Sequence, residues 1–169
     1  MTELSNYDFD LGKHTRTITT ASFQAQSWFN LGLNWVYGFN QEEAVICFQN
    51  AVKADPDCAM AYWGIAYAAG PFYNMAWRDF SLAEATTATA ICYNAAQTAL
   101  VKMNGCTQLE QALIKAIALR FQKNHPVEQT EYDKWDDDFA DAMRCVYKNY
   151  PHDMDVVAWF VEAAMTRTP

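Results

Sequence analysis

Residues Ala25 to Pro56 read AQSWFNLGLNWVYGFNQEEAVICFQNAVKADP, and this stretch decides the fold. Its large apolar residues recur at helical spacing. The small residues Gly32 and Ala44 would let two antiparallel helices approach closely, large residues would fill the groove between them, and Pro56 would end the second helix. The stretch therefore predicts a tightly packed helical hairpin.

The same stretch resembles the 34-residue helix-turn-helix unit of tetratricopeptide (TPR) repeats. It agrees with that unit at all of its eight signature positions, which are Trp28, Leu31, Gly32, Trp35, Ala44, Phe48, Ala51 and Pro56. The alternative is an ordinary amphipathic hairpin whose large and small residues fall in this register by chance. We therefore expect an all-α fold, a TPR-like α–α superhelix of antiparallel helix pairs, with about seven helices and an incomplete last repeat.

A second repeat begins one period later. Asp57 is expected to cap its first helix, whose apolar positions are Tyr62, Ile65, Ala66 and Ala69. Gly70-Pro71 should end that helix, and the aromatic segment FYNMAWRDF then delays the next one. The Ser81-x-x-Glu84 capping box restarts a helix. The second repeat is thus predicted to carry an insertion at residues 72–80.

Two further capping patterns predict a third repeat. Thr107-x-x-Glu110 should begin a helix that runs to about Phe121, and Thr130-x-x-Asp133 should begin one that ends at Tyr150, before Pro151. After that proline, Asp153 is a plausible N-cap, and apolar residues then follow at the spacing of a fourth first helix, namely Val157, Phe160, Val161 and Ala164.

These patterns divide the chain into an N-terminal extension, residues 1–21, and a TPR-like helical repeat domain, residues 22–169. The repeats cover about 25–58, 59–104 and 107–152, with a half repeat at 153–166. A solenoid repeat cannot bury its apolar face alone, so Trp159, Phe160 and Met165 are expected to lack an obvious cover. We expect either that the chain continues with more repeats or that a partner supplies the missing helix.

Composition limits the classes of partner. The 169 residues carry a formal net charge of -8, and the few basic residues are scattered, which argues against nucleic acid as a partner. The N-terminus carries charges where a signal peptide needs an apolar run, and no apolar stretch reaches the length of a membrane span. A cytoplasmic protein that binds no membrane is therefore expected.

No motif predicts metal or cofactor chemistry. The five cysteines (Cys47, Cys58, Cys92, Cys106 and Cys145) are odd in number and contain no CxxC pair, so they are interpreted as reduced core residues. His14, His125 and His152 are isolated from one another, and the chain has neither an HExxH motif, a glycine-rich phosphate loop nor a GxSxG elbow. We predict no metal and no cofactor, and no catalytic residue is identified.

Residues Tyr37 to Asn74, YGFNQEEAVICFQNAVKADPDCAMAYWGIAYAAGPFYN, resemble a group of TPR proteins found in bacteria and fungi. The shared features are YGFNxEEA, DPxCAM, WGxA, and GP followed by Asn. Residues Asp137 to Met165 look like the same group. The resemblance implies a longer chain with more repeats and no defined activity. Gln41 departs from the group, which often has His there.

The first helices of TPR pairs line the concave face of the array. The exposed positions of the first two repeats would be Gln26, Phe29, Leu33, Val36, Tyr37, Met60, Trp63 and Tyr67. They lack the basic residues of a carboxylate-binding groove, so a chaperone adaptor of that kind is disfavoured. This face is either an apolar groove for a helix or small molecule, or ordinary core covered by the N-terminal segment or by further C-terminal helices.

The insertion Phe72 to Phe80 contains Tyr73, Asn74, Trp77 and Arg78. It is expected either to form a lid over the groove or to fill the gap beside the displaced second helix with Phe72 and Trp77. Asp136, Asp137, Asp138 and Asp141 include the DDxxD spacing of diphosphate-binding Mg²⁺ sites. A solvated, acidic helix start explains them as well, and no second metal motif accompanies them.

The preferred interpretation is a TPR scaffold that binds a protein partner, or its own C-terminal continuation, through the apolar concave face and the aromatic insertion. Its binding residues would be Phe29, Leu33, Tyr37, Met60, Trp63, Tyr67, Tyr73, Asn74 and Trp77. The alternative is a small-molecule-binding protein or an enzyme of secondary metabolism whose pocket is the aromatic groove. A third hypothesis is a homodimer that forms through Trp159 and Phe160.

Overall fold

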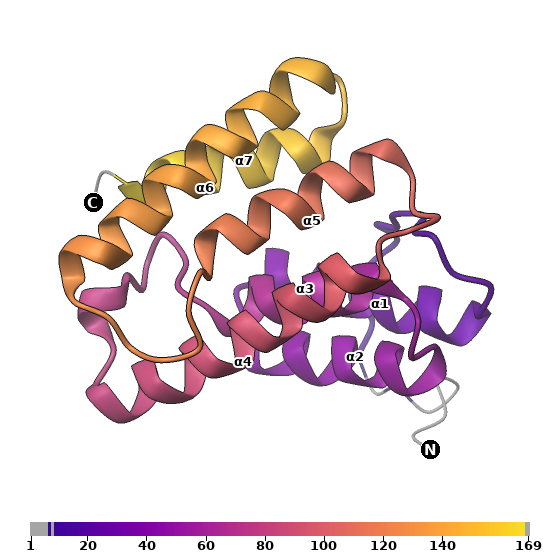
Figure 1. The fold of residues 1–169 in the computed structure, drawn as a ribbon. Coiled ribbons are helices and arrows are strands. Elements are labelled where there is room, and N and C mark those ends of the chain that lie inside the picture. Colours follow the sequence, from indigo (N-terminus) through magenta and orange to yellow (C-terminus); the bar gives the residue numbers. More distant parts are fainter. Residues whose placement is uncertain (1–6, 8, 168–169) are drawn as a thin grey trace.

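The fold is all-α. A computed structural model describes Tyr7 and residues 9–167 (Figure 1). In that part of the chain it has seven α-helices and no strand, with a 3₁₀ turn at Trp77–Asp79. The helices are α1 (Phe23–Tyr37), α2 (Gln41–Ala54), α3 (Ala59–Ala69), α4 (Leu82–Lys102), α5 (Gln108–Arg120), α6 (Gln129–Asn149) and α7 (Met154–Arg167). The predicted all-α class and the count of about seven helices are confirmed in this part of the chain, whereas the TPR superhelix remains a prediction.

Most helix starts lie where the sequence predicted them. Ser81 and Thr107 form capping boxes with Glu84 and Glu110, and Asp153 accepts a hydrogen bond from the backbone of Val156 at 3.0 Å. These side chains satisfy backbone N–H groups that have no partner within the first helical turn.

Two predicted caps were wrong. The α3 cap is Cys58 rather than Asp57, and Glu128 rather than Thr130 precedes α6. Neither Cys58 nor Glu128 makes a side-chain hydrogen bond to the helix. The polar residues Asp57 and Thr130 were therefore poor guides to where these helices begin.

The Phe48 ring holds α1, α2 and α3 together. It is fully buried, and ideal Cβ atoms built on Gly32 of α1 and Gly64 of α3 would lie only 2.6 and 2.5 Å from its carbons. Neither position has room for a methyl group, because the ring fills the space where the helices meet. The sequence argument that Gly32 permits close helix approach is confirmed by this contact.

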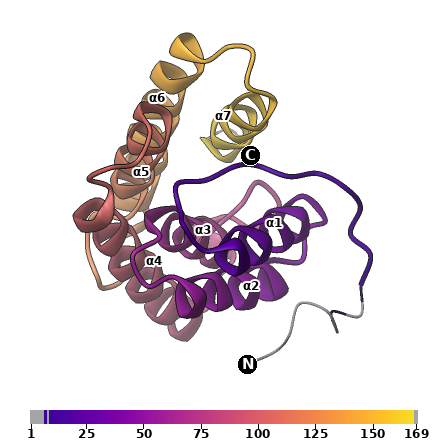
Figure 2. The same ribbon diagram turned by 90° about the vertical axis from the view of Figure 1, so that its right-hand side faces the viewer.

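Successive helices pack against each other from α1 to α7, and the chain curves so that α7 returns toward α3. Figure 2 shows this curvature: α1 to α3 lie on one side, α5 and α6 rise beside them, and α7 comes back above them. The Trp159 ring of α7 lies 4.7 Å from the Trp63 ring of α3. Aromatic side chains from α3 and α7 thus meet in the interior of the curve.

Residues 14–20 fit into the helical body, although they were predicted to form part of an extension. Figure 2 shows this segment crossing the space between α1 and α7. The backbone N–H of Ile18 donates to Gln26 of α1 at 2.9 Å, and that of Thr19 donates to Glu110 of α5 at 2.6 Å. The segment therefore joins helices that are distant in sequence and covers part of the concave face.

This segment also supplies a cover that the sequence analysis expected to be missing. Trp159 is 1% exposed, and the Arg16 guanidinium lies 5.0 Å from its ring centroid. Phe160 is half-buried and stacks on Tyr147 at 5.1 Å. The expectation that Trp159 and Phe160 lack a cover was wrong. The same expectation is confirmed for Met165, which is 45% exposed.

The insertion between α3 and α4 contributes both core and surface. Trp77 is buried and stacks on Tyr132 of α6 with ring centroids 4.2 Å apart, as expected of a residue that fills the gap beside a displaced helix. Phe72 and Met75 exchange two backbone hydrogen bonds, of 3.1 and 2.8 Å, which close a tight turn. That turn leaves Tyr73 and Asn74 exposed at its tip.

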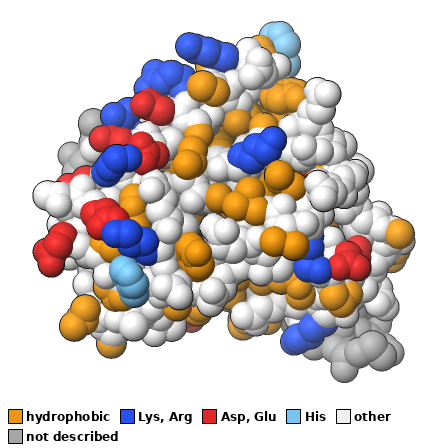
Figure 3. All heavy atoms as spheres, viewed as in Figure 1, with side chains coloured by type: hydrophobic (Ala, Val, Ile, Leu, Met, Phe, Trp, Pro, Cys, Tyr) orange, Lys and Arg blue, Asp and Glu red, His pale blue; other side chains and the backbone are white. Residues whose placement is uncertain are grey.

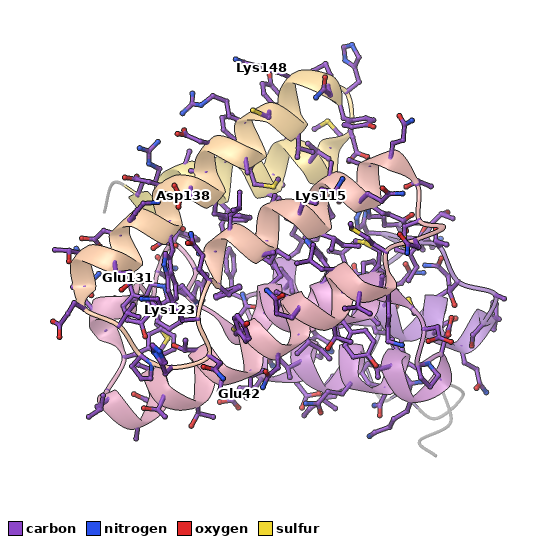
Figure 4. The ribbon with its side chains drawn as sticks, viewed as in Figure 1. Glu42, Lys115, Lys123, Glu131, Asp138 and Lys148 are labelled. Atoms are coloured by element: carbon purple, nitrogen blue, oxygen red, sulfur yellow. The ribbon has the colours of Figure 1, made fainter. Side chains whose placement is uncertain are left out.

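The outer face shown in Figure 3 carries most of its charges over α6 and the loop before it, whereas hydrophobic atoms are scattered over α4 and α5. In Figure 4, Lys123 and Glu131 point toward each other, and their ion pair measures 2.6 Å. Four cysteines are buried, but Cys145 is exposed, against the expectation of a core role for all five. Among the described helices, none is both long and apolar enough to span a membrane.

We expect Gly64→Ala to destabilise the protein by about 1–2 kcal/mol, because overpacking against the immobile Phe48 ring outweighs the better helix propensity of alanine. Urea unfolding followed by circular dichroism measures this change. Gly38→Ala is the matched control, since its Cβ would have its nearest neighbour at 3.4 Å, and it should change stability by less than about 0.5 kcal/mol. Equal effects of the two substitutions would contradict the role given to Phe48.

Candidate functional site

A cavity of about 420 Å³ opens where the ends of α1 and α3 meet α7 and the insertion. Its lining is mostly apolar and consists of Val36, Tyr37, Phe39, Gln41, Tyr67, Phe72, Tyr73, Ala158, Trp159, Val161, Glu162 and Met165. Pockets of this size and character commonly hold small organic molecules. The cavity is therefore the candidate site.

Tyr67 and Glu162 form the polar part of the cavity wall. The Tyr67 hydroxyl, on α3, donates a short hydrogen bond to Oε2 of Glu162 on α7. Burial and the adjacent Glu162 charge raise the pKa of Tyr67 well above its usual value, so this hydroxyl keeps its proton. The tyrosine thus acts as a hydrogen-bond donor that orients the carboxylate.

Arg120 lies behind this wall, at the end of α5. It is fully buried, its Nε donates to Asp136 of α6 at 3.3 Å, and its guanidinium lies 4.9 Å from the Phe139 ring centroid. Burial lowers the pKa of Arg120, but the charges of Glu162 and Asp136 outweigh that effect and raise it. Only Asp136 is hydrogen-bonded to the guanidinium; Glu162 acts on it through its charge, and Nη1 and Nη2 of Arg120 have no hydrogen-bond partner among the described residues.

Three polar atoms of cavity-lining residues are buried without a hydrogen-bond partner among the described residues. They are Oε1 of Gln41, Nε1 of Trp159 and Oε1 of Glu162. Buried polar atoms are rarely left unpaired, because each loses its hydrogen bonds to water. Each of the three has almost no exposed surface, so a ligand in the cavity does not contact it in this conformation.

A second charged cluster, at residues 14–16 and the start of α7, supports the cavity from the side of α1. The Nη1 atom of Arg16 lies 2.9 Å from carboxylate oxygens of both Asp153 and Asp155. His14 Nε2 and the Tyr37 hydroxyl lie 2.9 and 2.6 Å from the other Asp155 oxygen. Burial and the hydrogen bond to Asp155 raise the pKa of Tyr37, so it too remains a donor. The cluster fixes Tyr37, and with it one wall of the cavity.

Phe39 stands at the cavity rim in a strained backbone conformation. Its φ of 59° lies in the left-handed region, which a bulky side chain rarely adopts, yet the side chain is 59% exposed. Its ring meets that of Tyr73 edge-to-face at 5.8 Å. An exposed aromatic residue at a position that favours Gly or Asn is more typical of a binding surface than of a stabilising contact.

The structure brings three of the nine predicted binding residues to this cavity: Tyr37, Tyr67 and Tyr73. Five others are core residues, at most 3% exposed: Phe29, Leu33, Met60, Trp63 and Trp77. Asn74 is exposed beside the cavity but does not line it. Most of the predicted binding residues are therefore packed within the chain as core, which is the alternative given for them above.

The aspartates at 136–141 pair with cations from three helices. Asp136 faces Arg120, Asp138 binds Lys134 at 2.5 Å, and Asp137 and Asp141 both pair with Arg167. Within the described residues, no group of three or more His, Cys, Asp or Glu side chains is arranged to hold a metal ion. The expectation of a solvated helix start was wrong, because these aspartates lie in the middle of α6 and Asp136 is only 7% exposed.

Sequence reasoning missed Arg16, Asp155, Gln41 and Glu162 as parts of the site. Glu162 carried a usable signal, because it is the single acid in the apolar run AWFVEAAM. Gln41 was noted only as a departure from a resembling group. Arg16 and Asp155 gave no local signal, since 139 residues separate them.

Comparison of the chain with protein-family models, with curated proteins and with solved structures finds no match. The TPR resemblance therefore remains a prediction that rests on the eight signature residues and their spacing. The site is interpreted from its own geometry alone.

We expect the protein to lose stability as the pH falls below about 4. Burial acts to raise the pKa of Glu110 and Asp153, but hydrogen bonds outweigh it. Those from Thr19 and Thr107 lower the pKa of Glu110, and those from Arg16 lower the pKa of Asp153. Both carboxyls take up protons at higher pH in the unfolded chain, so their stabilisation is complete above the unfolded values near 4 and is lost as the pH falls through the lowered folded values.

Urea unfolding between pH 7 and pH 2.5 measures this loss. Each group contributes a slope of up to about 1.4 kcal/mol per pH unit in that acid range. Glu110→Gln still offers an oxygen to Thr19 but does not titrate, so its slope should be smaller than that of the wild type. An unchanged slope in this variant would contradict the role given to Glu110.

Proposed function

We propose that this protein binds a small, largely apolar molecule in the cavity between α1, α3, α7 and the insertion. The observation that carries the proposal is the cavity itself, which measures about 420 Å³ and has mostly apolar walls, with the Tyr67–Glu162 pair as their polar part. Apolar walls supply binding energy by burying the ligand surface, and a few polar groups fix its orientation. This arrangement supports the small-molecule alternative more directly than a bare scaffold.

Binding need not involve catalysis. Tyr37 and Tyr67 hold their protons firmly, because burial and neighbouring carboxylates raise the pKa of each. A hydroxyl in this state orients a ligand or a neighbouring carboxylate and makes a poor general base. The site therefore supports recognition better than proton transfer.

A protein-interaction scaffold is the second candidate, because apolar side chains are exposed at the cavity rim. Phe39 is 59% exposed, Val161 48% and Met165 45%. A partner side chain inserted into the cavity would cover these residues. An apolar helix or loop would then occupy the volume that the first proposal assigns to a small molecule.

The test of small-molecule binding uses N-phenyl-1-naphthylamine, a neutral probe that fluoresces in apolar surroundings. We expect saturable binding of one probe per chain. Val161→Trp should fill part of the cavity and weaken binding at least about tenfold, since the probe then loses buried apolar surface. Fluorescence titration measures the dissociation constant.

Val101→Trp on α4 is the matched control, because Val101 is also exposed and does not line the cavity. It should bind the probe like the wild type. The proposal is wrong if the wild type does not bind the probe, or if the two tryptophan variants bind it equally. If the cavity accepts only a side chain of a protein partner, the probe should show no saturable binding.

A further inference from the structure

A row of side-chain amides on α1 bonds the backbone of residues 14–18, in the segment that crosses between α1 and α7 (Figure 2). The amides belong to Gln26, Asn30 and Asn34, which share one face of the helix because four residues separate each from the next. The backbone groups that they bond belong to alternate residues of the segment, which are His14, Arg16 and Ile18. The segment therefore runs antiparallel to α1 and is held through its backbone.

The spacing of these bonds follows from the dimensions of the two chains. Asn34 Nδ2 donates to the carbonyl oxygen of His14 at 2.9 Å. One step along, the N–H of Arg16 donates to Oδ1 of Asn30 at 3.1 Å, and its carbonyl oxygen accepts from Nε2 of Gln26 at 2.7 Å. Two residues of extended chain advance by about 6.6 Å and four residues of helix by about 6 Å, so alternate residues of the segment meet successive amides. Another extended chain with the same direction could make these bonds, because they involve backbone atoms alone.

The Arg16 side chain occupies a pocket at the start of α7 that suits a cationic side chain. Its Nη1 donates to both oxygens of Asp153, at 2.9 and 3.1 Å, and to Oδ2 of Asp155 at 2.9 Å. The Trp159 ring completes the pocket, with its centroid 5.0 Å from the guanidinium carbon. Charge-assisted hydrogen bonds and an aromatic face both favour a guanidinium over a neutral group. The pocket therefore gives the segment a preference for Arg at this position.

Two further positions hold the segment in place. Ile18 is 5% exposed and belongs to the core, and among residues 9–20 it alone is buried. The N–H and the hydroxyl of Thr19 each donate to Glu110 at 2.6 Å. A segment with so few buried side chains belongs to the less stable parts of a fold, which open locally at low cost. Residues 14–20 thus resemble a bound peptide more than a part of the helical core.

We propose that α1, α5 and the start of α7 form a docking site for an extended peptide segment of a partner protein, and that residues 14–20 occupy this site as an internal, displaceable ligand. The partner segment carries Arg in the pocket of Arg16 and an aliphatic residue two positions later. Charge complementarity selects it, since the site presents the carboxylates of Asp153, Asp155 and Glu110. The inference does not depend on a ligand in the cavity.

The test adds a fluorescein-labelled peptide with the sequence of residues 12–21, GKHTRTITTA, to the whole 169-residue chain. In the host variant Arg16→Ala/Ile18→Ala the internal segment loses two anchors, while the docking site keeps all of its own residues. We expect the peptide to bind this variant at least about tenfold more tightly than the wild type, whose own segment competes for the site. Fluorescence anisotropy measures both dissociation constants. Equal affinities, or no binding to the folded variant up to about 1 mM peptide, overturn the inference.

Substitutions in the peptide and in the host test the arginine pocket. Arg16→Ala in the peptide should weaken its binding to the host variant at least about tenfold, whereas Thr17→Ala, at an exposed position, should change it less than about twofold. Adding Asp153→Asn to the host should reduce the preference for the Arg peptide to less than about threefold, while Asn can still cap α7. Glu42→Gln, an exposed site on α2, is the charge-matched control and should keep the full preference. Equal binding of the Arg and Ala peptides, or equal effects of the two host substitutions, overturns the inference.

Hydrogen exchange on the wild type keeps the inference testable if the host variant does not fold. The native peptide at about 1 mM should displace the internal segment and speed exchange at the Ile18 and Thr19 amides at least about threefold. The peptide with Arg16→Ala should leave both rates unchanged. Unchanged rates with the native peptide, or equal acceleration by the two peptides, overturn the inference.

Discussion

The packing of the N-terminal segment against α7 depends on the contacts of the Arg16 guanidinium. The guanidinium bonds Asp153 and Asp155 at the start of α7 and lies against the Trp159 ring. Its side chain is only 11% exposed, so water competes weakly for these charges. Removing the guanidinium would leave two partly buried carboxylates without the cation that they share, which makes their burial less favourable. The same contact fixes the N-terminal segment across the concave face and holds α7 over α3.

The candidate site follows from that closure. With α7 held over α3, Trp159 packs on Trp63, and Glu162 reaches the Tyr67 hydroxyl. The N-terminal segment and α7 cover part of the interior of the curve, and a cavity remains open beside the insertion, where Phe39 and Tyr73 form the rim. A surface that the repeat pattern presents as a long apolar groove is thus reduced to a cavity of about 420 Å³. This reduction in size favours a small molecule over an extended peptide.

Local features of the sequence predicted the fold well, because helices depend on periodicity and capping that lie within a few residues. The small residue Gly32 correctly indicated a close helix contact, and Ser81 and Thr107 correctly marked helix starts. The site was harder to predict. Asp155 meets Arg16 across 139 residues from an irregular segment, and no periodic pattern records such a contact. Glu162 was detectable in principle as a lone acid in an apolar helix. The burial of Trp159 was not, because it depends on residues 14–20, which had been assigned to an extension.

The most direct test of this account is native-state hydrogen exchange at the backbone amides of Ile18 and Thr19. These amides donate to Gln26 and Glu110, on helices α1 and α5. If the segment is a built-in part of the helical body, both amides should exchange at least about a hundredfold more slowly than in an unstructured peptide. Exchange at the rates of a free peptide would show that the segment does not cover the concave face, and would contradict the closure on which the cavity depends.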